Sequence, residues 1–281
     1  MEYGFLRLFL RTPFARPFVK RFVAGETIEK GMAVAEKLKK EGYKITLSYL
    51  GGEHLTDPKE IRNAFCAHSN LLTEMTRGGL HHDIAIKLSQ FGLFSEIHRQ
   101  WEIVFFQRLK NFVRRAELNN VFVWVDAEEL KFREKTFEII SHLHYDNLGV
   151  CVQAYAKDSL DFLQKNLRPN LAVRICKGAY KENEEGVFTN KKEIRYCFLD
   201  LVGHCVGEGV PRIQAATQDK YLIRYLTERI KGFKNVEVAV LLGRDKIFAD
   251  LVYVPFGPKW EDFIVRRIQE KPSYLFLPFK N

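Results

Sequence analysis

Short apolar runs rich in β-branched residues alternate along the chain with longer segments in which apolar residues recur at helical spacing. Near-continuous apolar strands separated by helices are typical of parallel βαβ units. Eight such units in a chain of this size predict a single α/β domain built as a (β/α)₈ barrel. The predicted strands are KITLSYL (44–50), DIAIKLS (83–89), VFVWVD (121–126), GVCVQAY (149–155), LAVRIC (171–176), RIQAAT (212–217), VEVAVLL (236–242) and DLVYVP (250–255).

Helical stretches are predicted between most of these strands. They cover 58–77, 94–117, 128–144, 191–208 and 219–231. The segment between the last two strands, GRDKIFA, is too short for a crossover helix, so we expect the barrel to be irregular there. The chain shows no internal repeat or linker. We therefore expect an N-terminal helical arm of about residues 1–42 and a barrel of residues 43–281.

The overall composition is that of an ordinary folded protein, with 46% hydrophobic and 28% charged residues among 281. No apolar run reaches roughly 18 residues, so no transmembrane helix is predicted. Lys and Arg exceed Asp and Glu by 44 − 35 = 9. This excess indicates either a merely basic surface or an anionic partner such as lipid headgroups. No nucleic-acid motif is present, so no nucleic-acid partner is expected.

The N-terminus, MEYGFLRLFLRTPFARPFVKRFVAG, is basic and aromatic, but Arg and Pro interrupt its apolar run. It is therefore interpreted as an amphipathic segment that could contact a membrane surface, and not as a signal peptide. Five cysteines without a C-x-x-C spacing indicate reduced, mostly buried thiols and a cytoplasmic location, with peripheral contact at the inner face of the membrane as the alternative. The eight histidines show no trusted metal spacing, so no metal site is predicted.

Polar residues follow most of the predicted strands, and a barrel carries its functional groups at the carboxyl ends of its strands. Each such residue alone could simply reach solvent. Together they predict a polar mouth that binds a charged ligand. The residues are Lys87, Asp126, Gln153, Arg174, Lys177, Thr217 and Tyr253.

The densest polar group is RICKGAYKE, residues 174–182. Arg174 and Lys177 precede Gly178 and Ala179, two small residues that let a ligand approach the backbone amides. Two cations and exposed amides suit a pyrophosphate or the electron-rich edge of a ring. The set fits a flat, flavin-sized ligand without identifying it. It is completed by one hydrogen-bonding amide and two aromatic faces: Gln153, Tyr180 and Tyr253.

A last helix is predicted in WEDFIVRRIQEKP (260–272), where Pro272 ends it. Its apolar residues recur at i, i+4 and i+8 and form a stripe that can pack against the fold. Arg266 and Arg267 lie on another side of the helix. They are either an ordinary solvated face or a clamp for a carboxylate.

These motifs, in this order, resemble the monofunctional proline dehydrogenases, an FAD-dependent family. The resemblance covers about residues 22–277. Its most specific pieces are V-R-x-x-K-G-A-Y and the late Y-V-P-x-G that precedes R-R. It implies a distorted barrel whose last helix, 258–270, lies across the mouth.

The activity implied by the resemblance is oxidation of L-proline to Δ1-pyrroline-5-carboxylate, the first step of proline catabolism. A hydride leaves the substrate carbon next to nitrogen for flavin N5, and the protein supplies position and electrostatics. A quinone or other membrane acceptor would take the electrons. A pyrroline-5-carboxylate dehydrogenase would consume the product.

The resemblance also assigns residues. It implies that Arg266 and Arg267, assisted by Lys87, clamp the proline carboxylate. It implies that Asp126 organises these cations and that Arg174 lies beside flavin N5, so Lys87, Asp126 and Arg174 are the implied catalytic set. The implied walls around the proline ring are Tyr180, Leu241, Tyr253 and Phe263. The implied cofactor contacts are Asp126, Gln153, Arg174, Lys177, Gly178, Ala179, Lys191, Thr217, Gln218 and Glu270.

Several positions depart from the family pattern. They are Phe263 for a usual tyrosine, Gln218 for a usual histidine, Asn190 for a usual arginine beside Lys191, Ala239 for a common glutamine, and a shortened segment after Gly243. Two other functions therefore remain under consideration. One is another flavin-dependent barrel, of the methylenetetrahydrofolate reductase type. The other is a non-catalytic, basic barrel subunit that associates with a membrane.

Overall fold

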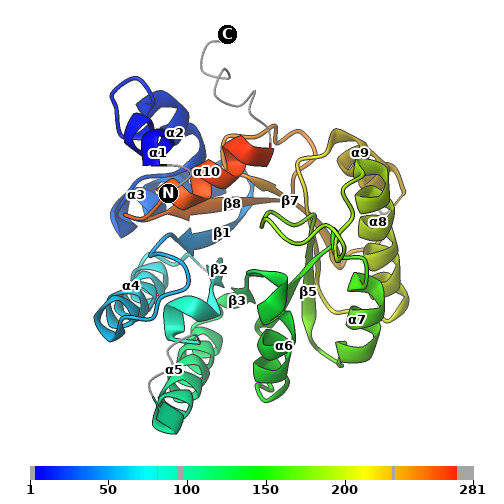
Figure 1. Ribbon diagram of the computed structural model, residues 1–281, viewed down its shortest axis with the longest axis horizontal. Coiled ribbons are helices and arrows are strands. Elements are labelled where there is room, and N and C mark those ends of the chain that lie inside the picture. Colours follow the sequence, from blue (N-terminus) through cyan, green and yellow to red (C-terminus); the bar gives the residue numbers. More distant parts are fainter. Residues whose placement is uncertain (1–3, 81, 94–97, 230–231, 271–281) are drawn as a thin grey trace.

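A closed barrel of eight parallel strands forms the centre of the molecule, with the strands in chain order and β8 paired to β1 (Figure 1). The computed structural model describes residues 4–80, 82–93, 98–229 and 232–270. All eight predicted strands are confirmed. The strands are β1 Lys44–Tyr49, β2 Asp83–Ile86, β3 Phe122–Val125, β4 Leu148–Gln153, β5 Ala172–Cys176, β6 Ile213–Ala216, β7 Val236–Leu241 and β8 Leu251–Phe256.

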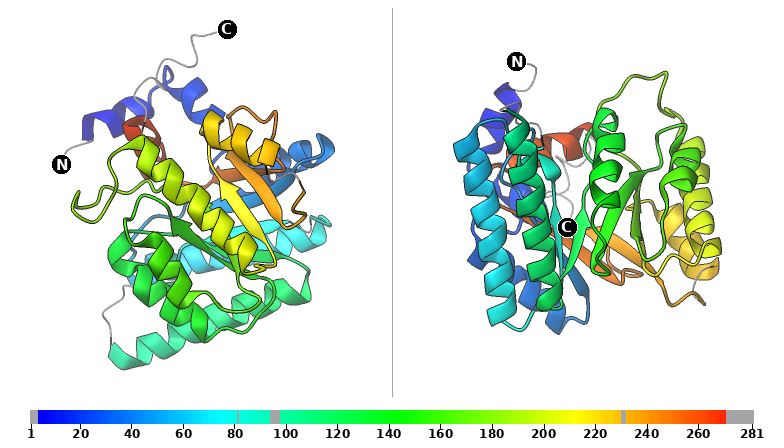
Figure 2. Two further views of the ribbon diagram at one scale, coloured as in Figure 1. Left: turned by 90° about the vertical axis from the view of Figure 1, so that its right-hand side faces the viewer. Right: turned by 90° about the horizontal axis from the view of Figure 1, so that it is seen from below.

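Helices surround this barrel and confirm the predicted βα alternation (Figures 1 and 2). The α-helices are α1 Gly4–Leu10, α2 Arg16–Phe22, α3 Ile28–Lys40, α4 Pro58–Arg77, α5 His98–Leu118, α6 Arg133–Ser141, α7 Ser159–Asn166, α8 Lys191–Gly207, α9 Lys220–Arg229 and α10 Glu261–Glu270. Two 3₁₀ turns, η1 Leu88–Phe91 and η2 Leu130–Phe132, follow β2 and β3. The predicted strand 83–89 was too long, because its last residues form η1. Parts of the predicted helices 94–117 and 219–231, and Pro272, lie outside the described residues.

The barrel strands separate an aliphatic exterior from a polar interior. Val and Ile side chains on the outer face pack under the helices and form the main core. Inside, the apolar cluster is small and consists of Ala85, Trp124 and Ala172, with Phe122 and Tyr253 packed against it. Barrels of this kind usually fill their centre with branched aliphatic residues. The polar interior of this barrel is therefore a departure that needs an explanation.

The predicted irregularity between β7 and β8 is confirmed, because residues 242–250 connect these strands without a helix. Helix α3 lies outside β8 and β1, where the last helix of a regular barrel would pack. The contact is close: a Cβ atom on Gly31 would lie 2.7 Å from the ring of Phe256. Because α3 fills this position, α10 is free to lie over the barrel mouth.

The arm helices α1 and α2 cover the outer side of α10, and the arm and α10 lie together in every view (Figures 1 and 2). Their shared apolar cluster includes Trp260, Ile264 and Ile268, which confirms the predicted stripe. Exposed ion pairs join Arg7 to Asp262 and Arg11 to Glu261. Among the helices that the structure describes, none is long and apolar enough to cross a membrane.

Candidate active site

Charged and polar side chains converge at the carboxyl ends of the strands. Lys87 directly follows β2, Asp126 directly follows β3, Gln153 ends β4, and Arg174 lies within β5. Lys87, Gln153 and Arg174 are all buried, with at most 9% of their surface exposed. Charges in such a site are costly unless opposite charges or hydrogen bonds compensate them, so their partners define the site.

Arg174 is fixed by contacts from several strands. Its Nη1 donates to Oδ1 of Asp126 at 2.6 Å, and its Nε donates to Oε1 of Gln214 at 2.8 Å. The guanidinium carbon lies 4.6 Å from the centre of the Trp124 ring and 5.4 Å from that of Tyr253. These contacts hold the cation in one orientation at the centre of the mouth.

Tyr253 completes this group by donating its hydroxyl hydrogen to Oδ2 of Asp126. Burial, with the nearby charge of Asp126, raises the pKa of Tyr253 well above its usual value. The phenol therefore remains neutral and remains a donor. Asp126 thus pairs with Arg174 and Tyr253; the role that the resemblance implies for it, organising Lys87, Arg266 and Arg267, stays a prediction.

Lys87 and Arg266 instead meet at Glu53, a residue of the loop after β1. Arg266 donates from Nη1 and Nη2 to the two carboxylate oxygens of Glu53, each at 2.5 Å, and Lys87 forms an ion pair with the same group. Burial alone would raise the pKa of Glu53, but the two cations outweigh it and hold the pKa at about 2. Glu53 is therefore a carboxylate at neutral pH, and it ties α10 to the barrel.

Glu53 was not predicted from the sequence. Its contacts nevertheless demonstrate that Lys87 and the Arg266 fork can hold a carboxylate, the chemistry expected of the clamp. Tyr180 lies beside them, with its ring centre 5.0 Å from the Arg266 guanidinium. Burial raises the pKa of Tyr180 to about 12, so its ring adds no charge.

Arg267 occupies a different environment from Arg266. Its guanidinium carbon lies 5.5 Å from the centre of the Phe263 ring. Phe263 is buried in the apolar cluster shared by α10 and the arm, and Leu241 packs against that cluster. The structure therefore places Arg267 beside Phe263, with Leu241 packed against the same apolar cluster. The side chain of Glu270 lies outside those that the structure describes.

A second polar group lies after β5 and β6, around Asp219. Lys177 forms an ion pair with Asp219, and Arg195 on α8 donates to both of its oxygens at 2.8 and 3.0 Å. Burial would raise the pKa of Asp219, but the contacts from Arg195 and Lys177 lower it to about 2. Arg195 was missed because a lone arginine within a helix has no distinguishing sequence signal.

The remaining predicted cofactor residues surround this group. The hydroxyl of Thr217 accepts from the Asp219 amide at 3.1 Å, and the Gln218 side chain accepts from Arg244 at 3.3 Å. Asn190, one of the departures from the family pattern, caps α8 by accepting from the Lys192 amide at 2.8 Å. Lys191, exposed, is the first residue of α8, and Ala179, partly exposed, follows Gly178.

Gly178 is the position where the backbone permits no side chain. Its φ is +102°, and a Cβ atom would lie 2.3 Å from the Tyr155 ring. The chain therefore turns tightly against Tyr155 immediately after β5, between Lys177 and Ala179.

Gln153, at the end of β4, donates to the carbonyl of Glu128 at 3.2 Å; Glu128 lies in the loop after β3.

The chain is similar to several known proteins. A family model described as proline dehydrogenase matches residues 32–273. Proline dehydrogenase 1 of Bacillus subtilis (strain 168) is 28% identical over 284 residues, which cover 93% of this chain and 91% of that protein. The proline dehydrogenase of Deinococcus radiodurans is 26% identical and covers 90% of this chain and 86% of its own length.

A solved structure shares the fold. The proline utilization A protein of Bdellovibrio bacteriovorus, inactivated by N-propargylglycine, superposes with a TM-score of 0.77 at 22% identity. The match covers 94% of this chain but 34% of that protein, so this chain spans about a third of its length.

The Glu53 contacts generate a prediction about stability. Glu53→Gln should lower the free energy of unfolding by about 3 kcal/mol at neutral pH, because a pKa lowered from 4.5 to about 2 corresponds to about that energy. Since the pKa is depressed in the folded state, the contribution is present above about pH 4.5 and is lost as the pH falls toward 2. Denaturant unfolding of both proteins over this range measures it.

The matched control is Glu60→Gln, which removes an exposed carboxylate paired with Lys259. That change should alter the free energy of unfolding by no more than about 0.5 kcal/mol at any pH. A deficit in Glu53→Gln that stays constant between neutral pH and pH 3 would contradict the assigned ion pair.

Proposed function

Since the chain belongs to the proline dehydrogenase family, we propose that it oxidises L-proline to Δ1-pyrroline-5-carboxylate with bound FAD. The observation that carries this proposal is the carboxylate site of Lys87 and Arg266, which already holds the ionised Glu53. It lies at the same barrel mouth as the fixed cation Arg174. A substrate with a carboxylate next to its reacting carbon needs both features.

The donor set fits FAD. Lys177 and Arg195 give two cations close to the first turn of α8, a combination that suits a pyrophosphate. Gln153 offers a buried amide that can hydrogen-bond the polar edge of a flat ring. When bound, FAD supplies the hydride acceptor. We propose the same role for the remaining residues near these groups: Gly178, Ala179, Lys191, Thr217, Gln218, Asp126 and Glu270.

The chain's own residues position the substrate. The forked guanidinium of Arg266 binds a carboxylate in one plane and so fixes orientation as well as charge. Lys87 adds a second cation, and Arg267 adds a third from the same helix. Tyr180 offers a neutral ring face beside Arg266. Arg174 supplies a fixed positive charge, which stabilises negative charge that develops nearby during the reaction.

We propose that helix α10, which contacts Glu53 at the mouth, shields the reacting centre from water. Its contact with Glu53 fastens it to the barrel, while the arm covers its outer side. An amine that enters the site neutral can use its electron pair to form the C=N bond as the hydride departs, which gives the protonated imine; its N–H proton is lost to water afterwards. No protein base is required for that step.

For the later fate of the electrons, we propose a quinone acceptor at a membrane surface. Leu8, Phe9 and Phe14 on the arm are exposed, Phe14 by 88%. Arg11, Arg16 and Lys20 line a cavity of about 590 Å³ between the arm and the start of α10. Exposed apolar residues beside cations suit an anionic lipid surface, which the arm, residues 1–42, would contact peripherally. A pyrroline-5-carboxylate dehydrogenase is the proposed consumer of the product.

Anaerobic reduction of the bound cofactor tests the proposed reaction. The purified protein should be yellow, and L-proline should bleach the visible absorbance of the oxidised flavin without any added acceptor. A protein that carries flavin but is not bleached by proline would favour another flavin-dependent barrel. A colourless protein that binds no FAD would favour a non-catalytic subunit.

The carboxylate clamp generates a second prediction. Arg266→Met and Arg267→Met should each weaken proline binding by roughly 30- to several-thousand-fold, because truncating one partner of a buried charge pair costs about 2–5 kcal/mol. Lysine at either position should rescue poorly, since it keeps the charge but loses the fork. Steady-state kinetics with proline and with pyrrolidine measure the effect, which should be small for pyrrolidine because it lacks the carboxylate.

Lys259→Met is the control for these variants, because Lys259 is an exposed cation beside the start of α10 that pairs with Glu60. It should leave both substrates unaffected. If all four arginine variants oxidise proline normally, α10 is only a surface helix.

The proposed lipid contact predicts a third result. Phe14→Glu combined with Leu8→Glu should reduce binding to anionic phospholipid vesicles by at least about tenfold, because each apolar side chain buried in lipid contributes roughly 1.5–3 kcal/mol. Co-sedimentation with vesicles measures this. Leu118→Glu alters a comparably exposed apolar residue at the end of α5, on another side of the barrel from α1 and α2 (Figure 1), and should have no effect. If both variants lose the same amount of vesicle binding, the arm is not the segment that contacts lipid.

A further inference from the structure

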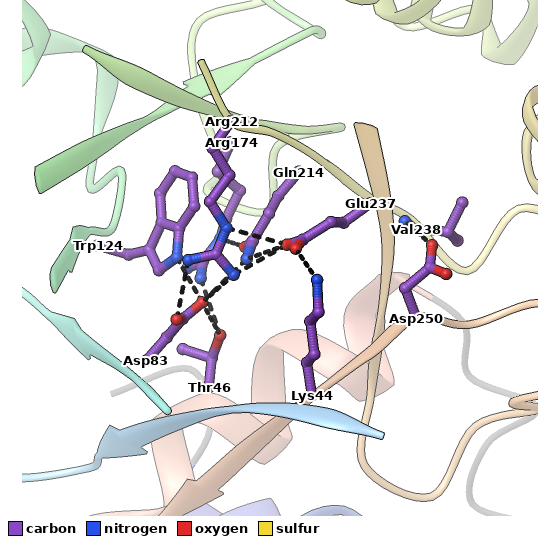
Figure 3. A network of polar contacts seen from close by, with 10 residues as sticks. All are labelled: Lys44, Thr46, Asp83, Trp124, Arg174, Arg212, Gln214, Glu237, Val238 and Asp250. Carbon is purple, nitrogen blue, oxygen red and sulfur yellow. Dashed lines mark hydrogen bonds and ion pairs between the residues drawn. The ribbon is translucent and has the colours of Figure 1, made fainter. Parts of the chain in front are cut away.

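A continuous column of hydrogen bonds runs inside the barrel from Arg174 to the opposite end of the strands (Figure 3). Its central member is Gln214 on β6, which is fully buried. Oε1 of Gln214 accepts from Nε of Arg174 at 2.8 Å. Its Nε2 donates to Oδ2 of Asp83 at 3.0 Å and to Oε2 of Glu237 at 3.2 Å.

The amino ends of the strands form the floor of this column. There Arg212 donates to both oxygens of Asp83 at 2.9 Å and to Glu237 at 2.9 and 3.1 Å. Trp124 donates its ring N–H to Asp83 at 2.8 Å, and Lys44 pairs with Glu237 at 2.6 Å. Figure 3 shows these side chains converging on the two carboxylates from different strands.

The two carboxylates determine which way the Gln214 amide points. A carboxylate only accepts hydrogen bonds, so the NH₂ group of the amide must face Asp83 and Glu237. The amide oxygen is then left facing Arg174, as an acceptor for its Nε–H. Thr46 makes a parallel link, because its hydroxyl lies 3.3 Å from Nη2 of Arg174 and donates to Asp83 at 3.4 Å.

The floor does not need Gln214 for its own neutrality. Without it, Asp83 would keep Arg212 and Trp124, and Glu237 would keep Arg212 and Lys44. Arg174, in contrast, would lose the acceptor of its single Nε–H in a buried site. Loss of the Gln214 side chain would therefore affect Arg174 more than the residues of the floor.

We propose that Gln214 is a positioning residue for the reaction, oriented by Asp83 and Glu237, and that it holds the Arg174 guanidinium in the orientation that acts on the bound flavin. The inference rests on the proposed function, since that function gives Arg174 its role. On this inference, the residues that influence the reaction extend from the barrel mouth to the floor. Residues at the far end of the strands then influence the cofactor through two successive hydrogen bonds.

The test is Gln214→Met, which keeps the length of the side chain and removes both polar groups. The rate of flavin reduction by saturating proline should fall roughly 10- to 100-fold, the size expected for losing a hydrogen bond to a charged group. The Michaelis constant for proline should change by less than about twofold, because Lys87, Arg266 and Arg267 are untouched. The midpoint potential of the bound FAD should become more negative, since the cation is less well placed to stabilise the reduced form.

Two further variants separate positioning from stability. Asn147→Leu removes side-chain hydrogen bonds to the carbonyls of Val113 and Val121, away from the column. It should destabilise the protein but leave the potential and the reduction rate unchanged. Gln214→Leu removes the same polar groups with a shorter side chain and should shift both quantities in the same direction as Gln214→Met. If Gln214→Met does not fold, the potential and the reduction rate of this second variant test the inference instead.

A potential and a reduction rate equal to those of the unmodified protein, in a folded Gln214→Met or Gln214→Leu variant, would overturn the inference and leave the column with a structural role only. The same conclusion would follow if Asn147→Leu produced equal changes. The midpoint potential is measured without proline. The inference about Gln214 is therefore decided even if proline fails to reduce the cofactor and the proposed function falls.

Discussion

Compensation of buried charge inside the barrel is the constraint on which the rest of the structure depends. Asp126 pairs with Arg174 within the mouth, and Glu53 pairs with both Lys87 and Arg266 at its rim. At the floor, Asp83 and Glu237 both pair with Arg212, and Glu237 also pairs with Lys44. A purely aliphatic interior would be at least as stable, because desolvating charges offsets much of their attraction. The proposed function would account for the charges at the mouth, since a fixed cation and a carboxylate site are what that chemistry requires.

The position of α10 follows from the packing of α3. Because α3 lies against β8 and β1, the last helix is free to cross the mouth, where its polar side supplies Arg266 and Arg267. Its apolar side would then be exposed, and the arm helices α1 and α2 cover it. One displacement of a helix thus accounts for both the place of Arg266 at the mouth and the packing of the arm on α10.

The sequence was sufficient for the barrel, because buried parallel strands leave continuous apolar runs that are easily recognised. It was also sufficient to place Lys87 directly after β2 and Arg174 within β5, because both positions follow from the strand ranges. It did not reveal Glu53, which lies 34 residues before Lys87 and 213 before Arg266 in a loop without periodicity. Gln214 was missed for another reason. Strand alternation predicts that a side chain points inward, but not which groups above and below it become its partners.

A crystal structure of the FAD-loaded protein with a saturated five-membered-ring carboxylic acid that lacks the amine would test the account most directly. Such a ligand keeps the carboxylate of proline but cannot be oxidised to an imine. The account predicts its carboxylate between Lys87, Arg266 and Arg267, with its ring against Tyr180 and with Arg174 still bound to Asp126 and Gln214. A carboxylate bound elsewhere in the mouth, with Arg266 and Lys87 contacting Glu53 alone, would contradict it.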